Sequence, residues 1–163
     1  MKITDVMKRE AASIPSSASI GQAVELFIAR HIGTLPVVDE SNKLVGVFPL
    51  SCAIELVMPD FTRLMEDFDF VRDFGAVESR KPTLEALARP VQQVMEEPIS
   101  VEETGGLVHA FALLHHHSLN DLPVVNADGR LIGIVSRVDV GTALLVNWGA
   151  PNISMRPPKE DAR

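Results

Sequence analysis

The segment "GIVSRVDV", residues 133–140, carries a serine and an aspartate three positions apart, where an apolar run ends. A hydroxyl and a carboxylate with this spacing can cap a helix, because Ser136 would accept a hydrogen bond from a free backbone N–H and Asp139 would favour the positive end of the helix. The same groups can bind a ligand, since a helix N-terminus offers donors to a phosphate and a carboxylate accepts hydrogen bonds from a ribose diol. Taken alone, the pair favours the helix cap.

Other groups of residues predict neither catalysis nor a metal site. The sequence has no HExxH, GxSxG or GxxxxGK motif, and Cys52 has no neighbouring histidine that would activate its thiol. The "HHH" run at 115–117 cannot converge on one ion, because consecutive helical residues point about 100° apart. His109 and His116 could share a helix face but supply only two ligands. We therefore expect a binding protein with no catalytic residue and no metal ligand.

Composition and charge limit the classes of partner. The chain has 163 residues, a net charge of −7 and a pI of about 5.2, which disfavours binding to nucleic acid. One cysteine excludes an intrachain disulfide and favours a reducing compartment. The sequence shows neither a signal-peptide apolar region nor a run of about 18 apolar residues, so we expect a cytoplasmic protein that does not insert into membranes.

The sequence repeats itself. "LPVVDESNKLVGVF" at 35–48 is echoed by "LPVVNADGRLIGIV" at 122–135, an offset of 87 residues. Upstream, "DVMKREAASI" at 5–14 is similar to "QVMEEPISV" at 93–101. The duplication predicts two similar units that bury their apolar faces against each other.

Each unit begins with a predicted short strand, at 12–14 and at 99–101, followed by a helix. Ser19 with Gln22 would cap the first helix, and Thr104 would start the second. Helical spacing predicts one buried stripe per helix, formed by Ile20, Val24, Phe27 and Ile28 and by Leu107, Phe111 and Leu114.

Each unit continues with a predicted hairpin and a closing helix. Turns at 39–42 and 126–129 join two apolar strands, of which the second ends near Phe48 or Val135. The closing helices are expected to end near Met58 and Asn147. The predicted order is strand, helix, strand, strand, helix.

The repeats are predicted to span residues 1–60 and 91–148. The connector, 61–90, has an acidic face and helically spaced apolar residues, which indicates that it is partly helical; these residues are Leu64, Phe68 and Val71. Its phenylalanines could pack on the protein's own core, which we favour, or form a contact with a partner. The tail, 149–163, is rich in proline and charge and is expected to be disordered.

The order of these motifs resembles a known family. Two copies of a "VM" start and an "LPVV" strand, with "GIVS" running into "RVD", are similar to a tandem pair of cystathionine β-synthase (CBS) domains, or Bateman module. The resemblance covers about residues 1–60 and 90–147. It implies an α/β (α+β) fold of two βαββα repeats packed with pseudo-twofold symmetry, with clefts between the repeats that bind adenosine-containing molecules.

The resemblance makes ligand binding by Ser136 and Asp139 the favoured interpretation, with the ribose as their target. It also implies a wider set of ligand-binding residues, which are Ser100 at the adenine edge, Leu122, Pro123 and Val135 around the base, and Arg137. In the first repeat Pro49 and Cys52 stand at the equivalent positions, so that site is expected to be degenerate. Ser51 would then cap the closing helix of the first repeat.

The identity of the ligand stays open between AMP, ADP, ATP and S-adenosylmethionine. Nucleotide-binding members of the family often carry a His-Arg pair before the "LPV" strand, and this sequence has Gly33-Thr34 and Asn120-Asp121 there. Arg137, Arg30 and Lys43 could replace the pair, but such residues are more often solvated surface charges. A polyphosphate is therefore the least supported ligand.

The predicted function is a regulatory, ligand-sensing module that needs no cofactor, forms a homodimer and signals to a protein partner of unknown identity. One alternative is a scaffolding dimer with vestigial ligand sites. Another is an undetected enzyme that processes a nucleotide.

Overall fold

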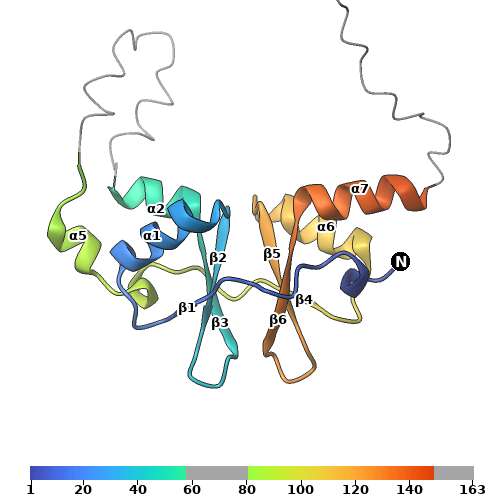
Figure 1. Ribbon diagram of the computed structural model, residues 1–163, viewed down its shortest axis with the longest axis horizontal. Coiled ribbons are helices and arrows are strands. Elements are labelled where there is room, and N and C mark those ends of the chain that lie inside the picture. The colour runs from blue at the N-terminus through green and yellow to red at the C-terminus, as the bar shows by residue number, and fades with distance from the viewer. Residues whose placement is uncertain (58–80, 149–163) are drawn as a thin grey trace, which may run out of the picture.

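The computed structural model describes residues 1–57 and 81–148, which form two halves of the same architecture (Figure 1). The first half contains β1 (Ile14–Pro15), α1 (Ile20–Arg30), β2 (Thr34–Val38), β3 (Leu44–Pro49) and α2 (Leu50–Val57). The second half contains β4 (Val101–Glu102), α6 (Leu107–His116), β5 (Asp121–Val125), β6 (Leu131–Ser136) and α7 (Arg137–Asn147). Shorter elements precede them, namely η1 (Ile3–Asp5), α5 (Leu84–Ala88) and η2 (Val91–Gln93). The predicted α/β order of strand, helix, strand, strand, helix is confirmed.

The two sheets have identical topology and register. In each, the short first strand runs parallel to the central strand, which pairs with the third strand antiparallel. Leu35 lies opposite Phe48 in the first sheet, and Leu122 lies opposite Val135 in the second. In Figure 1 the four long helices lie on one side of the molecule and the two hairpins project from the other.

The halves pack through equivalent residues. Leu44 N–H donates to the Gly129 carbonyl, and Leu131 N–H donates to the Asn42 carbonyl, both at 3.0 Å. Each bond joins a hairpin of one half to the hairpin of the other at positions related by the repeat offset. This exchange is what a pseudo-twofold axis between the halves requires.

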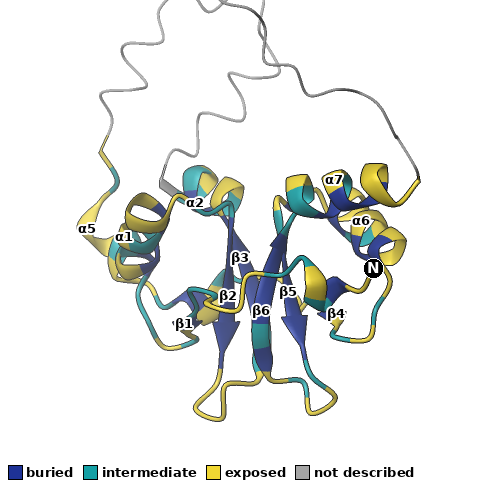
Figure 2. Ribbon diagram, turned by 45° about the vertical axis from the view of Figure 1, so that its right-hand side comes forward, coloured by how far each residue is buried: buried dark blue, intermediate teal, exposed yellow. Residues whose placement is uncertain are grey.

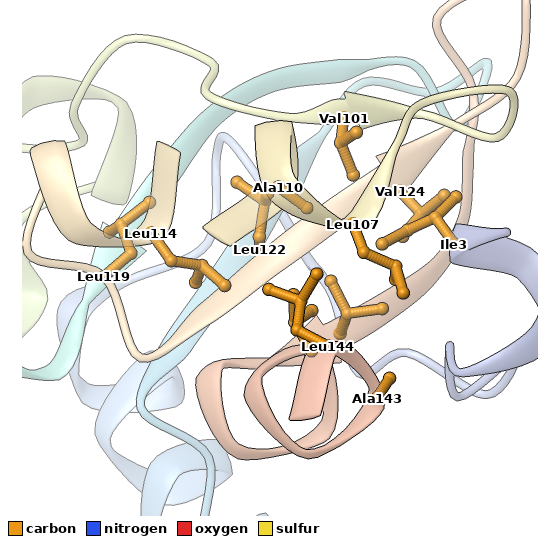
Figure 3. Packing of buried hydrophobic residues seen from close by; sticks show 12 residues of the cluster. Ile3, Val101, Leu107, Ala110, Leu114, Leu119, Leu122, Val124, Ala143 and Leu144 are labelled. Atoms are coloured by element: carbon orange, nitrogen blue, oxygen red, sulfur yellow. The ribbon is translucent and has the colours of Figure 1, made fainter. Parts of the chain in front are cut away.

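Each half is completed by the segment that precedes the other half. Lys8 pairs with Ile134 of β6 through two backbone hydrogen bonds of 2.9 Å. Glu96 likewise pairs with Val47 of β3 through two backbone hydrogen bonds, of 2.8 and 3.2 Å. Ile3, fully buried, lies in the core of the second half close to Val124 (Figure 3). Val91, equally buried, lies in the core of the first half. The predicted boundaries at residues 60 and 91 divide the chain by its sequence repeat. The two cores do not follow this division, because each contains the leading segment of the other repeat.

The buried face of each first helix differs from the predicted stripe. The inward residues are Ile20, Ala23 and Phe27 on α1 and Leu107, Ala110 and Leu114 on α6. Ile28 and Phe111, predicted to be buried, are 69% and 38% exposed. Ile28 is rotated about 80° from Ile20 around the helix, because eight residues exceed two turns. An alanine is the middle of the three buried residues on each helix. Figure 2 shows the strands largely buried and the helices with exposed faces.

The predicted cap of α1 and both predicted turns are present, but the predicted start of α6 is not. The Ser19 and Gln22 capping box is confirmed, as are the turns at 39–42 and 126–129. Thr104 does not start a helix, because it lies in a turn closed by a bond from Gly105 N–H to the Glu102 carbonyl, and α6 begins at Leu107.

Other predicted boundaries shift by a few residues. The short first strands lie at Ile14–Pro15 and Val101–Glu102 rather than at 12–14 and 99–101. Ser51 is not a cap, since α2 already begins at Leu50, whose N–H donates to the Gly33 carbonyl. The predicted end of α7 at Asn147 is confirmed.

Part of the predicted connector and the whole tail lie outside the described residues, together with Leu64, Phe68 and Val71 and the expected helix end near Met58. The described part of the connector contains α5, capped by the Thr83 hydroxyl. Among the helices that the structure describes, none has the length and apolar character needed to cross a membrane.

Candidate functional site

Ser136 and Asp139 form a complete capping box at the start of α7. The Ser136 hydroxyl accepts from Asp139 N–H at 3.0 Å, and Asp139 Oδ2 accepts from Ser136 N–H at 3.4 Å and from its hydroxyl at 2.7 Å. The predicted cap is therefore confirmed. All of these contacts use Oδ2, so within the described residues Oδ1 accepts no hydrogen bond, and the side chain is 32% exposed. The cap leaves one carboxylate oxygen available to a ligand.

Lys8 supplies a counter-charge to this carboxylate. Its Nζ lies 3.6 Å from Asp139 Oδ2, and its position is set by the backbone pairing of Lys8 with Ile134. Burial tends to raise the pKa of Asp139, but the Ser136 hydroxyl and the Lys8 charge outweigh it, and the pKa is lowered from its usual value of 3.8. Asp139 is therefore ionised at neutral pH and ready to accept hydrogen bonds.

A cavity of about 400 Å³ lies beside the capping box, between the two halves. Its lining includes Lys8, Glu10, Ala11 and Ala12 from the leading segment, Arg30, His31 and Ile32 from the end of α1 and the following loop, and Asp121, Ile134 and Ser136 from the second half. Both halves therefore contribute to one cleft, and this volume falls within the range of small-molecule sites.

A second cavity of about 640 Å³ adjoins the first. The two share four residues, His31, Ile32, Asp121 and Ser136. The remaining lining of the second cavity comes largely from apolar side chains, which are Phe27, Ile28, Leu50 and Val138. A ligand in the first cavity could thus extend into an apolar space on the helical side.

The structure separates the residues predicted to surround a base. Leu122 and Val135, opposite each other and fully buried, belong to the core of the second half. Figure 3 shows Leu122 among side chains of α6 and α7. Pro123 lies opposite Ile134 on the other face of the sheet, and Ile134 lines the cleft. Ser100, just before β4, lines neither of these two cavities. The structure thus places Ser136 in the cleft lining, whereas Asp139 lines neither cavity and reaches the cleft only through its contacts with Ser136 and Lys8.

Arg137 is neither a solvated charge nor a free phosphate ligand. Its Nη2 donates to the carbonyl oxygens of Leu114 and Leu119, at 2.9 and 2.8 Å, and so fixes the end of α6. Arg30 is exposed and lines the cleft, whereas exposed Lys43 lies in the first hairpin and lines neither cavity. Of the three predicted basic residues, Arg30 lines the first cavity and Arg137 lines the second, while Lys43 lies at neither.

The sequence interpretation missed three residues at the site, Lys8, His31 and Asp121. His31 ends α1 in the left-handed region, with φ of 50°, and lines both cavities. Asp121 directly precedes the second "LPVV", where nucleotide-binding members of the family often have a basic residue. Aligning the two leading segments places Lys8 opposite Glu96. This change of charge between the repeats is the one sequence feature that could have drawn attention to Lys8.

At the equivalent positions of the first half, a thiol replaces the carboxylate and a carboxylate replaces the amine. Cys52 replaces Asp139, and its thiol donates to Glu96 Oε1 at 3.2 Å, where Glu96 replaces Lys8. Burial first, and then the hydrogen bond and charge of Glu96, raise the pKa of Cys52 to about 12. The thiol is therefore protonated at neutral pH, and this half lacks the carboxylate that could accept a ribose diol.

The raised pKa predicts that Cys52 reacts slowly with alkylating agents. We expect iodoacetamide at pH 7.5 to modify it roughly 1000-fold more slowly than a free thiol, because so little thiolate is present. Mass spectrometry over time measures the rate, and Glu96→Gln should increase it. A rate equal to that of glutathione would contradict the assignment of a buried, acid-paired thiol.

The histidine run gives no metal site. His116 ends α6 and His117 follows as its exposed C-cap. In the described parts of the chain, no cluster of three or more histidine, cysteine or acidic side chains could hold a metal ion.

Comparisons with known proteins identify the fold and the repeat. The family model described as "CBS domain" matches residues 3–58 and 91–145. The chain is 32% identical to the CBS domain-containing protein CBSX2, chloroplastic, of Arabidopsis thaliana, over 81% of this chain and 58% of the relative. The chain thus spans little more than half the length of that relative.

Solved structures share the architecture. A crystal structure of CBSX2 in complex with AMP is 28% identical, with a TM-score of 0.65 over 90% of this chain and 98% of that one. The CBS domain pair of protein MJ0100, solved with 5'-methylthioadenosine and S-adenosyl-L-methionine, is 19% identical, with a TM-score of 0.61 over 88% and 99%, and shows the same fold. The chain therefore belongs to the CBS domain family and contains two copies of the domain.

Proposed function

We propose that the chain is a regulatory module that binds one adenosine-containing molecule in the 400 Å³ cleft, with Asp139 and Ser136 at the ribose. The observation that supports this most directly is the ionised Asp139 carboxylate: its Oδ1 accepts no hydrogen bond from the described residues, and its Oδ2 contacts Ser136 and Lys8, which line a cleft built from both halves. A carboxylate can accept hydrogen bonds from both hydroxyls of a ribose, and such charge-assisted bonds are strong.

The base would lie against the apolar part of the cleft wall. Ala11, Ala12 and Ile134 supply that surface, and Pro123 lies beside Ile134 on the same face. Leu122 and Val135 would support this wall from the core side without contacting the ligand through their side chains. The AMP complex of CBSX2 supports an adenosine ligand, because the two proteins share the fold at 28% identity.

Ligand binding would act on the arrangement of the halves. Arg30 and His31 come from the first half, Ser136 and Asp139 come from the second, and Lys8 belongs to the segment that crosses between them. A molecule that contacts all of these shifts the protein toward the arrangement in which the contacts fit best. A protein partner that distinguishes this arrangement would then be regulated by the ligand.

Calorimetric titration of adenosine, AMP and S-adenosylmethionine into the protein tests the proposal. We expect binding of at least one of them, with one site per chain and without turnover. If none binds below millimolar concentration, the module is a scaffold with vestigial clefts. If a product forms, the protein is an enzyme.

We also propose a homodimer formed through the helical side. Large apolar side chains that do not line the second cavity are exposed there on α6 and α7, namely Val108, Phe111, Leu145 and Val146. Apolar side chains gathered in this way favour burial against a second copy with closed twofold symmetry.

Sedimentation at micromolar concentration measures the assembly. We expect about twice the chain mass of 17.8 kDa for the unmodified protein, and a shift toward the single-chain mass for Leu145→Asp, because a charge on exposed α7 would be buried without a partner. Lys43→Ala, on the hairpin side, serves as the control and should leave the mass unchanged. A single-chain mass for the unmodified protein would contradict the dimer.

A further inference from the structure

Asp121 lies on the boundary between the two cavities. It is the first residue of β5, directly opposite Ser136 in the β5–β6 pair, and it lines both the 400 Å³ and the 640 Å³ cavities. Directly opposed residues of antiparallel strands are about 4.5–5.5 Å apart between Cα atoms. A ribose held at Ser136 and Asp139 therefore has Asp121 as its neighbour, and a group that leaves the ribose toward the second cavity passes the Asp121 carboxylate.

This carboxylate already occupies a pair of anion-binding donors. Asp121 Oδ2 accepts from the backbone N–H of Gly33 at 2.7 Å and from that of Thr34 at 3.1 Å. Successive backbone N–H groups of this kind are what a ligand phosphate would use. Because Asp121 takes both and adds its own negative charge, an incoming phosphate would meet repulsion there and lose these two donors.

The basic residues of the cleft do not offset this charge. Lys8 faces the Asp139 carboxylate at 3.6 Å, and Arg30 shares the lining with Glu10. With Asp121 included, the cleft and its diol-binding carboxylate carry one more acidic than basic side chain. Within the 400 Å³ cleft, a 5'-phosphate would therefore add negative charge to a lining that is already negative.

The second cavity offers a different kind of contact. Its apolar lining comes from Phe27, Ile28, Ile32, Leu50 and Val138, on α1, the loop after it, α2 and α7. Arg137 also lines this cavity, but its Nη2 is already bound to the Leu114 and Leu119 carbonyl oxygens. An alkyl or thioether group gains from leaving water for such a surface, whereas a phosphate loses its hydration.

We propose that Asp121 selects the 5'-substituent of the ligand, so that the cleft binds adenosines with an uncharged or cationic 5'-group, such as a thioether or sulfonium, in preference to 5'-phosphates. This inference rests on the proposed adenosine site. Asp121 acts on specificity through charge, and its hydrogen bonds to Gly33 and Thr34 hold it at the point where the 5'-group leaves the ribose.

Asp121→Asn separates charge from structure, because the amide oxygen can still accept from Gly33 and Thr34. Adenosine, 5'-methylthioadenosine and AMP are titrated by calorimetry into the unmodified protein and the variant. We expect 5'-methylthioadenosine to bind the unmodified protein at least ~10-fold more tightly than AMP, and Asp121→Asn to strengthen AMP ~10-fold, the order expected for charges a few ångströms apart near a protein surface. The affinities of the two uncharged ligands should stay the same, and Asp128→Asn in the exposed hairpin turn should change none of the three.

Salt dependence of the unmodified protein provides a second measurement if Asp121→Asn does not fold. Raising the salt concentration from about 0.05 to 0.5 M should strengthen AMP relative to adenosine, because repulsion is screened. AMP binding as tight as 5'-methylthioadenosine, with a ratio unchanged by salt or by Asp121→Asn, would overturn the role of Asp121 and leave the adenosine site intact. Failure of all three ligands to bind would instead overturn the site itself, and this inference with it.

Discussion

Replacing Asp139 by alanine is expected to weaken adenosine binding by about 1.5–3 kcal/mol, which is roughly 10- to 150-fold in affinity. The reason is that the ionised carboxylate accepts from the ribose hydroxyls, and hydrogen bonds to a charged group contribute this much when they are lost. Calorimetric titration of the folded variant measures the change. The ligand 2'-deoxyadenosine, with one hydroxyl fewer, should lose part of the same free energy on the unmodified protein.

The helix cap requires a matched control, because Asp139→Ala also removes the hydrogen bonds to Ser136. Ser136→Ala removes the hydroxyl that caps α7 and leaves the carboxylate in place. Both variants should lose about 1 kcal/mol in free energy of unfolding. Ser136→Ala should cost about 0.5–1.5 kcal/mol of binding free energy, as for a neutral hydrogen bond, whereas Asp139→Ala should cost about 1.5–3 kcal/mol. If binding survives Asp139→Ala unchanged, Asp139 is a helix cap only and the assigned site is wrong.

Replacing Ile3 by alanine is expected to lower the free energy of unfolding by about 2–5 kcal/mol. Ile3 is fully buried in the second half's core, among residues that include Leu107 and Val124, so truncation leaves a cavity that the packed neighbours cannot fill. The effect is large for a residue at the very start of the first repeat, because its contacts lie in the core of the second half. Urea unfolding followed by circular dichroism measures it.

Met1→Ala is the control for this variant, because Met1 is 58% exposed and its truncation should change stability by about 0.5 kcal/mol or less. Val91→Ala, in the equivalent segment, should destabilise the protein through the core of the first half. A loss below about 1 kcal/mol for Ile3→Ala would show that the leading segment does not complete the core of the second half.

The repeat and its elements could be predicted because their signals are local. The Ser136 and Asp139 capping box joins residues three positions apart, so the sequence alone contains both partners. The hairpin turns could be predicted for the same reason, since Asn42 and Gly129, which adopt positive φ, lie where turn-forming residues cluster in the sequence. The exchange of leading segments was not predicted, because nothing near Ile3 indicates that its contacts lie in the other repeat.

The wall of the site was harder to predict than the cap. All five residues of β2 are buried, as are four of five in β5, so polarity does not alternate along these strands. Without alternation, the sequence does not show that Leu122 faces the helices while Pro123 lies on the other face. Lys8 reaches the site through its pairing with Ile134, and Asp121 through the pairing of β5 with β6 opposite Ser136; spacing along the chain reveals neither pairing.

The most direct test of the adenosine site is a crystal structure of the protein grown with adenosine. We expect one adenosine per chain in the cleft between Ala12 and Ile134, with its ribose hydroxyls within about 3 Å of the Asp139 carboxylate. Adenosine bound beside Cys52 in the first half, or a cleft without ligand at saturating adenosine, would contradict it.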